Sequence, residues 1–218
     1  MLELATGSGL ALAAGLNAWI PLVALGLLSR YTDLITLPAA WGWLENGWVL
    51  GILAVLLLLE VVADKIPVVD SVNDVVQTVV RPTAGGIAFG AGAASQTTTV
   101  TDPGAFVQSG QWIPVVSGIV LALVVHATKA GTRVVADTTT GGTAAPVLSA
   151  VEDAGSVALS IVAVMLPLLI IPLLALLVLA VVLVVRRVRR RRASRQWLRA
   201  TGGMPPTMEL PPVRPPRG

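Results

Sequence analysis

Long apolar runs that end in charged residues constrain this chain more than any other feature of its sequence. Residues 49–59 read VLGILAVLLLL, and Glu60 and Asp64 follow before the run reaches the roughly 20 residues that cross about 30 Å of hydrocarbon. Residues 116–125 read VSGIVLALVV and are followed in the same way by His126. The fold has to accommodate charge at these positions, because hydrocarbon does not solvate it.

Composition indicates the class of protein. The 218 residues are 55% hydrophobic and only 12% charged, with a mean hydropathy of +0.82, which lies outside the range of soluble globular domains. We therefore predict an all-α fold, a polytopic transmembrane helical bundle. The first apolar segment has no basic region before it and carries Glu3, so we expect a retained span and not a cleaved signal peptide. The absence of cysteine excludes disulfides and thiolate metal sites.

Five segments are candidates for membrane spans. They are residues 5–28, 48 to about 64, 83–100, 112–136 and 154–185. Residues 66–82 are too polar to face lipid, so we expect a connector there. The third candidate is weak, and a four-span alternative in which it only re-enters the membrane stays open. The last candidate is longer than a bilayer needs and contains Pro167 and Pro172, so we expect a tilt, a kink or an extension into water.

The charges divide the chain into two domains. Residues 1–185, the transmembrane helical domain, carry five basic side chains against eleven acidic ones, whereas residues 186–218 carry ten arginines against one glutamate. The positive-inside bias places this Arg-rich and Pro-rich tail in the cytoplasm, which predicts a multi-pass protein of the cell (inner or plasma) membrane. We expect the tail to be disordered and to contact anionic lipid headgroups. No nucleic-acid partner is expected, because the basic charge belongs to the tail alone.

Helical spacing gathers the charged residues of the first domain into stripes. One stripe is formed by His126, Lys129, Arg133 and Asp137, and another by Asp70, Asp74, Gln77 and Arg81. Two smaller groups are the pair Glu60 and Asp64, four residues apart, and Glu152 with its neighbour Asp153. A charged residue near the centre of a spanning helix costs about 2.5–3.5 kcal/mol, and each Leu, Ile or Val returns only about 0.3–0.6 kcal/mol. The stripes are therefore expected to face one another or water inside the bundle, with acidic groups neutralising basic ones.

No catalytic motif accompanies these charges. HExxH, GxSxG and P-loop sequences are absent, and one histidine with scattered acids does not form a convincing zinc site. We therefore predict no cofactor, no metal and no enzyme activity. The candidate binding residues are Glu60, Asp64, Asp70, Asp74, Arg81, His126, Lys129, Arg133, Glu152 and Asp153.

Three strings in the sequence carry a resemblance to a known family. They are LLEVVADKIPVVDSVNDVVQTVVRPTAGG (58–86), HATKAGTR (126–133) and VEDAGSV (151–157). Over about residues 5–170 the chain resembles a bacterial integral-membrane family catalogued as domain of unknown function, family 4126. Asp137 stands where the family pattern leads us to expect an asparagine. The resemblance implies a helical membrane fold and no established activity.

Three functions are compatible with these observations. We favour a transporter-like or channel-like protein that moves a small polar solute or a lipid headgroup, with Glu60 and His126 as protonatable groups and with Lys129 and Arg133 recognising anions. The second is a structural or assembly protein whose charges only lock helix packing, and a homo-oligomer is compatible with either. The third is a membrane enzyme that acts on lipid phosphate through four carboxylates, those of Asp70, Asp74, Glu152 and Asp153.

Overall fold

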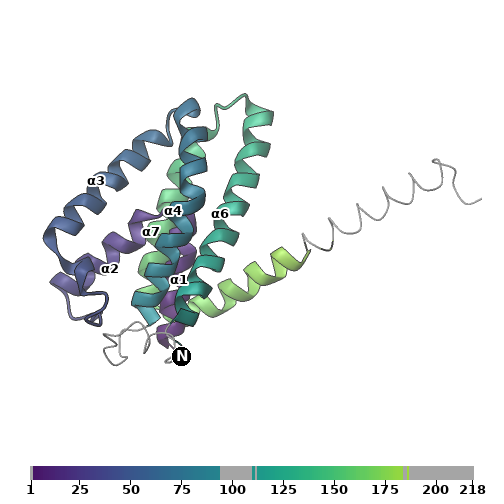
Figure 1. Cartoon of the computed structure of the whole chain (residues 1–218). Coiled ribbons are helices and arrows are strands. Elements are labelled where there is room, and N and C mark those ends of the chain that lie inside the picture. The colour runs from purple at the N-terminus through teal and green to yellow at the C-terminus, as the bar shows by residue number, and fades with distance from the viewer. Residues whose placement is uncertain (1, 94–109, 111, 184–185, 187–218) are drawn as a thin grey trace, which may run out of the picture. The chain divides into compact units, whose positions relative to one another are not determined.

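The described part of the chain is all-helical in the computed structural model (Figure 1). The structure describes residues 2–93, 110, 112–183 and 186, apart from the side chains of residues 67, 68, 70, 71 and 137. The chain divides into two compact units, residues 1–172 and residues 173–218. The described residues of the second unit include helix over residues 173–183. The expected tail, beyond residue 186, lies outside the described residues.

The first unit contains all of the helices that surround the candidate site. In chain order they are α1 (Leu2–Leu16), α2 (Trp19–Tyr31), the 3₁₀ helix η1 (Gly42–Glu45), α3 (Gly47–Ala63), α4 (Pro67–Ala93), α6 (Trp112–Thr140), α7 (Ala145–Met165) and the 3₁₀ helix η2 (Pro167–Leu169). Two of them, α6 and α7, are long and apolar enough to cross a membrane. The prediction of an all-α fold is confirmed over the described residues.

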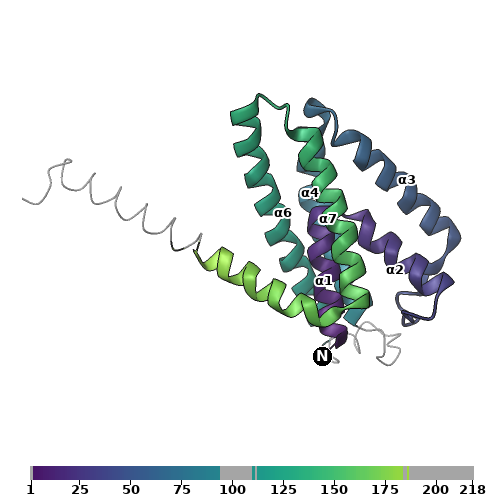
Figure 2. The same cartoon turned by 180° about the vertical axis from the view of Figure 1, so that it is seen from behind.

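Helix α1 lies at the centre of the first unit. It packs against α4, α6 and α7, and both views of the ribbon show it enclosed by these three helices (Figures 1 and 2). Its sequence, LELATGSGLALAAGL, consists largely of small residues, and every residue from Gly7 to Gly15 is buried. Small side chains let helix backbones approach closely, so α1 is held by backbone-to-backbone packing more than by large apolar side chains.

The tightest helix contact lies between α4 and α6. A Cβ atom on Gly118 would lie 2.3 Å from the carbonyl oxygen of Gly85, and one on Gly85 would lie 2.3 Å from the Cβ of Ala122. Only glycine fits at such a contact, because the opposing atoms belong to backbone or to a side chain that cannot rotate away. The Gly-rich sequence of α4 therefore sets the distance between these two helices.

The first expected span, residues 5–28, is wrong as a single helix. The structure breaks it at Asn17 and Ala18 into α1 and α2. The two helices form a hairpin, because the beginning of α1 and the segment that follows α2 line one cavity together. This cavity of about 320 Å³ is bordered by Leu2, Glu3, Thr6, Asp33, Leu34, Ile35, Thr36, Val164 and Pro167. The end of α7 therefore lies at the same end of the unit as the N-terminus.

The expected connector 66–82 is also wrong. The expected third span, residues 83–100, is helical over residues 83–93 but does not begin a new segment, and residues 94–100 lie outside the described residues. Residues 67–93 form one continuous helix, α4, which includes Pro82. The helical spacing of its polar residues had predicted an inward stripe, and Gln77 and Arg81 are buried as that stripe requires. The error was to treat the segment as a connector between two spans. The valines on the opposite side are exposed, with 72% of Val75 accessible. This helix is amphipathic with its polar face inside, which inverts the pattern of a soluble bundle.

The last expected span, residues 154–185, begins too late. Its helix is interrupted at Pro167, one of the two prolines named for a kink, and residues 184–185 lie outside the described residues. Helix α7 starts at Ala145 after a turn in which Gly141 and Gly142 adopt positive φ angles of 63° and 84°, and it ends at Met165 before Pro167. The ring of Pro167 and its missing N–H end the α-helical hydrogen bonding, and η2 follows. Glu152 and Asp153, which precede the expected start of that span at residue 154, consequently lie on the second and third turns of α7.

Two glycines on α6 test the importance of the α4–α6 contact. Gly118→Ala is expected to destabilise the protein by about 1–3 kcal/mol, because its Cβ would overlap the backbone of Gly85. Gly131→Ala is the matched control, since its Cβ would meet nothing within 4 Å and alanine favours helix by roughly 0.5–1 kcal/mol. Thermal unfolding of both variants in detergent measures the difference. Equal stability of the two variants would contradict the close contact.

Candidate functional site

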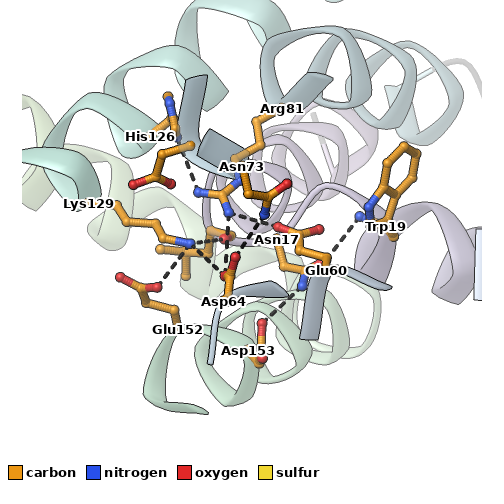
Figure 3. A network of polar contacts seen from close by, with 12 residues as sticks. Asn17, Trp19, Glu60, Asp64, Asn73, Arg81, His126, Lys129, Glu152 and Asp153 are labelled. Carbon is orange, nitrogen blue, oxygen red and sulfur yellow. Dashed lines mark hydrogen bonds and ion pairs between the residues drawn. The ribbon is translucent and has the colours of Figure 1, made fainter. Parts of the chain in front are cut away.

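A group of buried charged side chains lies where α3, α4, α6 and α7 approach one another (Figure 3). We call it the charged cluster, and its members are Glu60, Asp64, Arg81, Lys129, Arg133 and Glu152. All except Glu152 are at most 4% exposed. The three carboxylates balance the three cations, which matters because an unbalanced charge in such an interior carries a desolvation cost of several kcal/mol.

Arg81 of α4 forms the most deeply buried ion pair of the charged cluster. Its Nη2 lies 2.7 Å from Oε1 of Glu60, and both side chains are at most 1% exposed. The same Nη2 is 3.9 Å from Oδ2 of Asp64, one helical turn further along the chain. A guanidinium stays protonated in proteins, so the pair fixes a permanent positive charge between two carboxylates.

Lys129 and Arg133 of α6 form the second half of the charged cluster. Lys129 Nζ lies 2.9 Å from Oε2 of Glu152, and Arg133 Nη2 lies 2.6 Å from the same oxygen. Both cations also approach Oδ2 of Asp64, at 3.6 and 3.4 Å. Asp64 therefore joins the two halves, and the amide of Asn73 donates a further hydrogen bond of 2.9 Å to its other oxygen.

The break between α1 and α2 lies beside this cluster. The carbonyl of Leu16, at the end of α1, accepts a hydrogen bond of 3.2 Å from Lys129 Nζ. Asn17 begins α2, because its Oδ1 accepts from the backbone N–H groups of Trp19 and Ile20, and its amide donates to Asp153 at 2.9 Å (Figure 3). A lysine at a helix C-terminus and an asparagine at a helix N-terminus satisfy backbone groups that the break leaves open.

His126 extends the polar interior along α6. Its Nδ1 lies 3.2 Å from Nη1 of Arg81, and its Nε2 lies 3.2 Å from the hydroxyl of Thr78. Thr78 in turn donates to the backbone carbonyl of Asp74 at 2.9 Å. The imidazole therefore bridges α6 and α4 within the buried interior.

Several buried polar atoms of this region have no hydrogen-bond partner among the described residues. They are Oε2 of Glu60, Oδ1 of Asp74, Oε1 of Gln77 and Nε of Arg81. A buried unpartnered polar atom costs about 1–3 kcal/mol. Three of the four are acceptors, so the polar interior has more acceptor capacity than its own donors use.

Two cavities are bordered by described residues that do not belong to the charged cluster. One lies between α1, the segment after α2 and the end of α7, as given above. Another, of about 410 Å³, is lined by apolar residues of α3, namely Trp48, Gly51, Ile52, Val55 and Leu56. Neither is bordered by Glu60 or His126, which are themselves only 3% and 4% exposed.

The structure gathers most of the residues that the sequence singled out. Seven lie together, namely Glu60, Asp64, Arg81, His126, Lys129, Arg133 and Glu152. The predicted pairing of acids with Lys129 and Arg133 is present for Asp64. Glu60 pairs with Arg81, which the sequence placed on the same stripe as Asp70 and Asp74. Asp153 instead binds Asn17, and Asp74 has no described ion pair. The side chains of Asp70 and Asp137 lie outside the described set. Whether any of these residues binds a ligand stays a prediction.

The four carboxylates expected for a lipid-phosphate enzyme do not share one site in the described part of the chain. Glu152 is held by two cations and Asp153 by an amide. Among the described residues, no group of three or more histidines, aspartates or glutamates is placed to hold a metal ion.

Sequence reasoning missed Asn17 and Asn73. Both amides donate to carboxylates that the sequence had singled out. Asn17 could have been found, since asparagine is a preferred residue at the start of a helix. Asn73 could have been found as well, since it lies three residues after Asp70 and four before Gln77 and so falls on the stripe that their spacing predicted.

The fold and the site define a helical protein with an apolar exterior and a charge-balanced polar interior. The chain belongs to the family described as Domain of unknown function (DUF4126), whose family model matches residues 4–187. The resemblance seen in the sequence is thereby confirmed, and the match extends beyond the 5–170 expected. No curated protein and no solved structure matches the chain.

The ion pair between Glu60 and Arg81 can be tested by a double-mutant cycle. Glu60→Gln and Arg81→Met are each expected to cost about 3–5 kcal/mol, because each leaves an uncompensated buried charge. The double variant should lose less than the sum by more than about 0.5 kcal/mol, since the two groups interact directly. Chemical unfolding in detergent gives the three values. Lys65→Gln, at an exposed position, is the control and should change stability by about 0.5 kcal/mol or less. Strict additivity would contradict the pair.

Proposed function

We propose that this chain is a multi-pass membrane protein whose charged cluster controls the passage of a small polar solute. The first support is the inverted polarity of the first unit. Arginine, lysine and aspartate are buried at 0–4% exposure in the charged cluster, whereas Val72, Val75 and Val79 on the outside of α4 are 66–72% exposed. Water would disfavour both the buried charges and the exposed valines, whereas a hydrocarbon environment favours both.

Helix lengths suggest how the chain crosses the bilayer. The 27 residues of α4 and the 29 of α6 give about 40 Å of helix, and the 21 of α7 give about 31 Å. The 17 residues of α3 give about 25 Å, enough with flanking residues for a thin crossing. The 15 of α1 and 13 of α2 give only about 20 Å each. We therefore propose four crossings, α3, α4, α6 and α7, around a re-entrant hairpin formed by α1 and α2.

Single-cysteine labelling tests this topology, because the natural chain contains no cysteine. Leu2→Cys and Leu34→Cys introduce exposed thiols before and after the hairpin, and Thr139→Cys introduces one at the opposite end of the unit. A membrane-impermeant maleimide should label the first two from one side of an oriented vesicle and the third from the other. A full crossing over residues 5–28 would instead put positions 2 and 34 on opposite sides.

The break in the α1–α2 hairpin is the observation that carries the transport function. Discontinuous helices that end near the middle of a membrane supply backbone groups to solute sites in many transporters. Here the end of α1 and the beginning of α2 meet Lys129 and Asp153 next to the charged cluster. The unpartnered acceptors of Glu60 and Gln77 provide further polar capacity for a solute. The structure then corresponds to a closed state, in which the ion pairs fill the space that a solute would occupy.

Flux through proteoliposomes that hold the full chain tests this function. The assay uses a panel of anions, cations and labelled lipids, with empty liposomes as the blank. Glu60→Gln should change the flux of the transported species by about tenfold, equivalent to about 1.4 kcal/mol in a barrier. Lys65→Gln should leave it unchanged, because Lys65 is exposed and bonds only to the carbonyl of Val61 among the described residues. A folded Glu60→Gln variant with unaltered flux of every species would contradict the transport function.

The second candidate function is a structural one, favoured by the balance of three acids and three bases. Buried ion pairs can fix helix register without any further role, and an apolar replacement of both partners is often tolerated. A Glu60→Leu/Arg81→Met double variant distinguishes the structural function from the transport function. If the charges only hold the helices, this variant should fold and behave as the wild type in every assay; loss of flux in a folded variant favours transport.

For the tail we keep the proposal made from its arginines. It faces the cytoplasm and meets anionic headgroups, at about 1 kcal/mol for each arginine near the surface. Removal of residues 187–218 should weaken binding of the protein to anionic lipid without altering the charged cluster.

A further inference from the structure

The hydrogen bonds around His126 run in one direction. Arg81 Nη1 lies 3.2 Å from His126 Nδ1, His126 Nε2 lies 3.2 Å from Thr78 Oγ1, and this hydroxyl donates to the carbonyl of Asp74. A guanidinium has only donors, so Nδ1 of His126 has to accept. The proton of the neutral imidazole then resides on Nε2 and is donated to Thr78, whose own proton is already given to the carbonyl. Each donor in this series of hydrogen bonds therefore has one acceptor.

From this geometry we propose that Nδ1 of His126 is a proton-binding site whose occupation releases the imidazole from Arg81. A proton delivered by water forms an N–H bond with the Nδ1 lone pair. The hydrogen bond from Arg81 is lost in the same step, because Nδ1 is no longer an acceptor, while Arg81 keeps all of its own protons. The imidazolium and the guanidinium then repel each other at a distance that previously held a hydrogen bond.

Asp74 is the group that receives the charged imidazole. It lies within electrostatic range of His126, one helical turn before Thr78 on α4, and its buried Oδ1 has no hydrogen-bond partner among the described residues. The other charged groups that face this region are cations on two helices and the acids with which these cations form ion pairs. They are Arg81 on α4, Lys129 and Arg133 on α6, Glu60 and Asp64 at the end of α3, and Glu152 on α7.

Proton uptake therefore redistributes the polar contacts across the bundle. Before it, Arg81 is shared between Glu60 and His126, so it joins α3 to α6 through α4. Afterwards Arg81 contacts only the acids at the end of α3, and His126 pairs with Asp74. The link that Arg81 provides between α3 and α6 is then broken. The use of this change to move a solute rests on the proposed function, whereas the proton site itself does not.

The chain offers a direct measurement because His126 is its only histidine. The full chain is labelled with ¹⁵N in the imidazole ring and reconstituted in lipid nanodiscs for NMR. At neutral pH the spectrum should show the proton on Nε2 and an unprotonated, hydrogen-bonded Nδ1. On acidification through the pH range below neutral, to an extent set by burial and by Arg81, Lys129 and Arg133, which oppose a further positive charge, both nitrogens should become protonated, and Nδ1 should gain proximity to the ¹³C carboxyl of Asp74.

Two matched variants separate the roles of the neighbours. Thr78→Ala removes the acceptor of Nε2 but leaves Arg81, so the Nε2–H form should persist. Arg81→Met removes the donor to Nδ1, so the preference for that form should be lost. If Arg81→Met does not fold, the spectra of the wild type and of Thr78→Ala still test the proton site on Nδ1. A proton on Nδ1 of the wild type at neutral pH would overturn the proposal, and so would an imidazolium that stays beside Arg81.

Flux measurements keep this inference distinct from the proposed function. His126→Gln retains an acceptor for Arg81 but cannot bind a proton in this pH range, so its flux should lose the pH dependence of the wild type. Absence of flux from the wild type would overturn the transport function and leave the proton site supported by the NMR result. A pH-dependent flux that persists unchanged in His126→Gln would overturn the coupling of His126 to transport.

Discussion

Charge balance inside the charged cluster is the constraint on which the rest of the structure depends. Arg81 and Glu60 are in direct contact at full burial, and Asp64 links this pair to Lys129 and Arg133. Each ion is costly to bury by itself, so none of the four helices that carry them can leave the bundle without exposing an unpaired charge to the interior. The apolar exterior supplies little force between helices in hydrocarbon, which leaves polar contacts and close packing to hold them.

Close packing holds one part of the first unit together, and ion pairs hold another. Glycine and alanine bring α1, α4 and α6 together where α1 fills the centre, and the contact of Gly85 with Gly118 shows how little space remains. Beyond the end of α1 the centre is filled by the charged cluster. The Leu16 carbonyl meets Lys129 at this boundary, so the broken helix and the cluster form one connected feature. A change in the cluster would therefore reach the α1–α2 hairpin directly.

Residue spacing predicted the inward stripe of α6 well. His126, Lys129 and Arg133 recur at three and four residues, and all three are buried as their common face required. Spacing also predicted the inward stripe of residues 70–81, but residues 66–82 suggested a connector because they are too polar to face lipid. A helix whose polar face is buried and whose valines are exposed reads as too polar when its hydropathy is averaged. The break at Asn17 was missed for the opposite reason, because one asparagine barely alters an apolar average.

The sequence by itself determined the helical class, the apolar exterior, the family and the phase of the charged stripes, because each of these follows from local composition or from residues within a few turns. Only the tertiary structure decided which charges meet. Glu60 could have paired with any of three cations, and its choice of Arg81 depends on how α3 lies against α4. The same holds for Asn17 with Asp153, which are 136 residues apart. Partner choice is set by packing between helices, and no local pattern encodes the geometry of that packing.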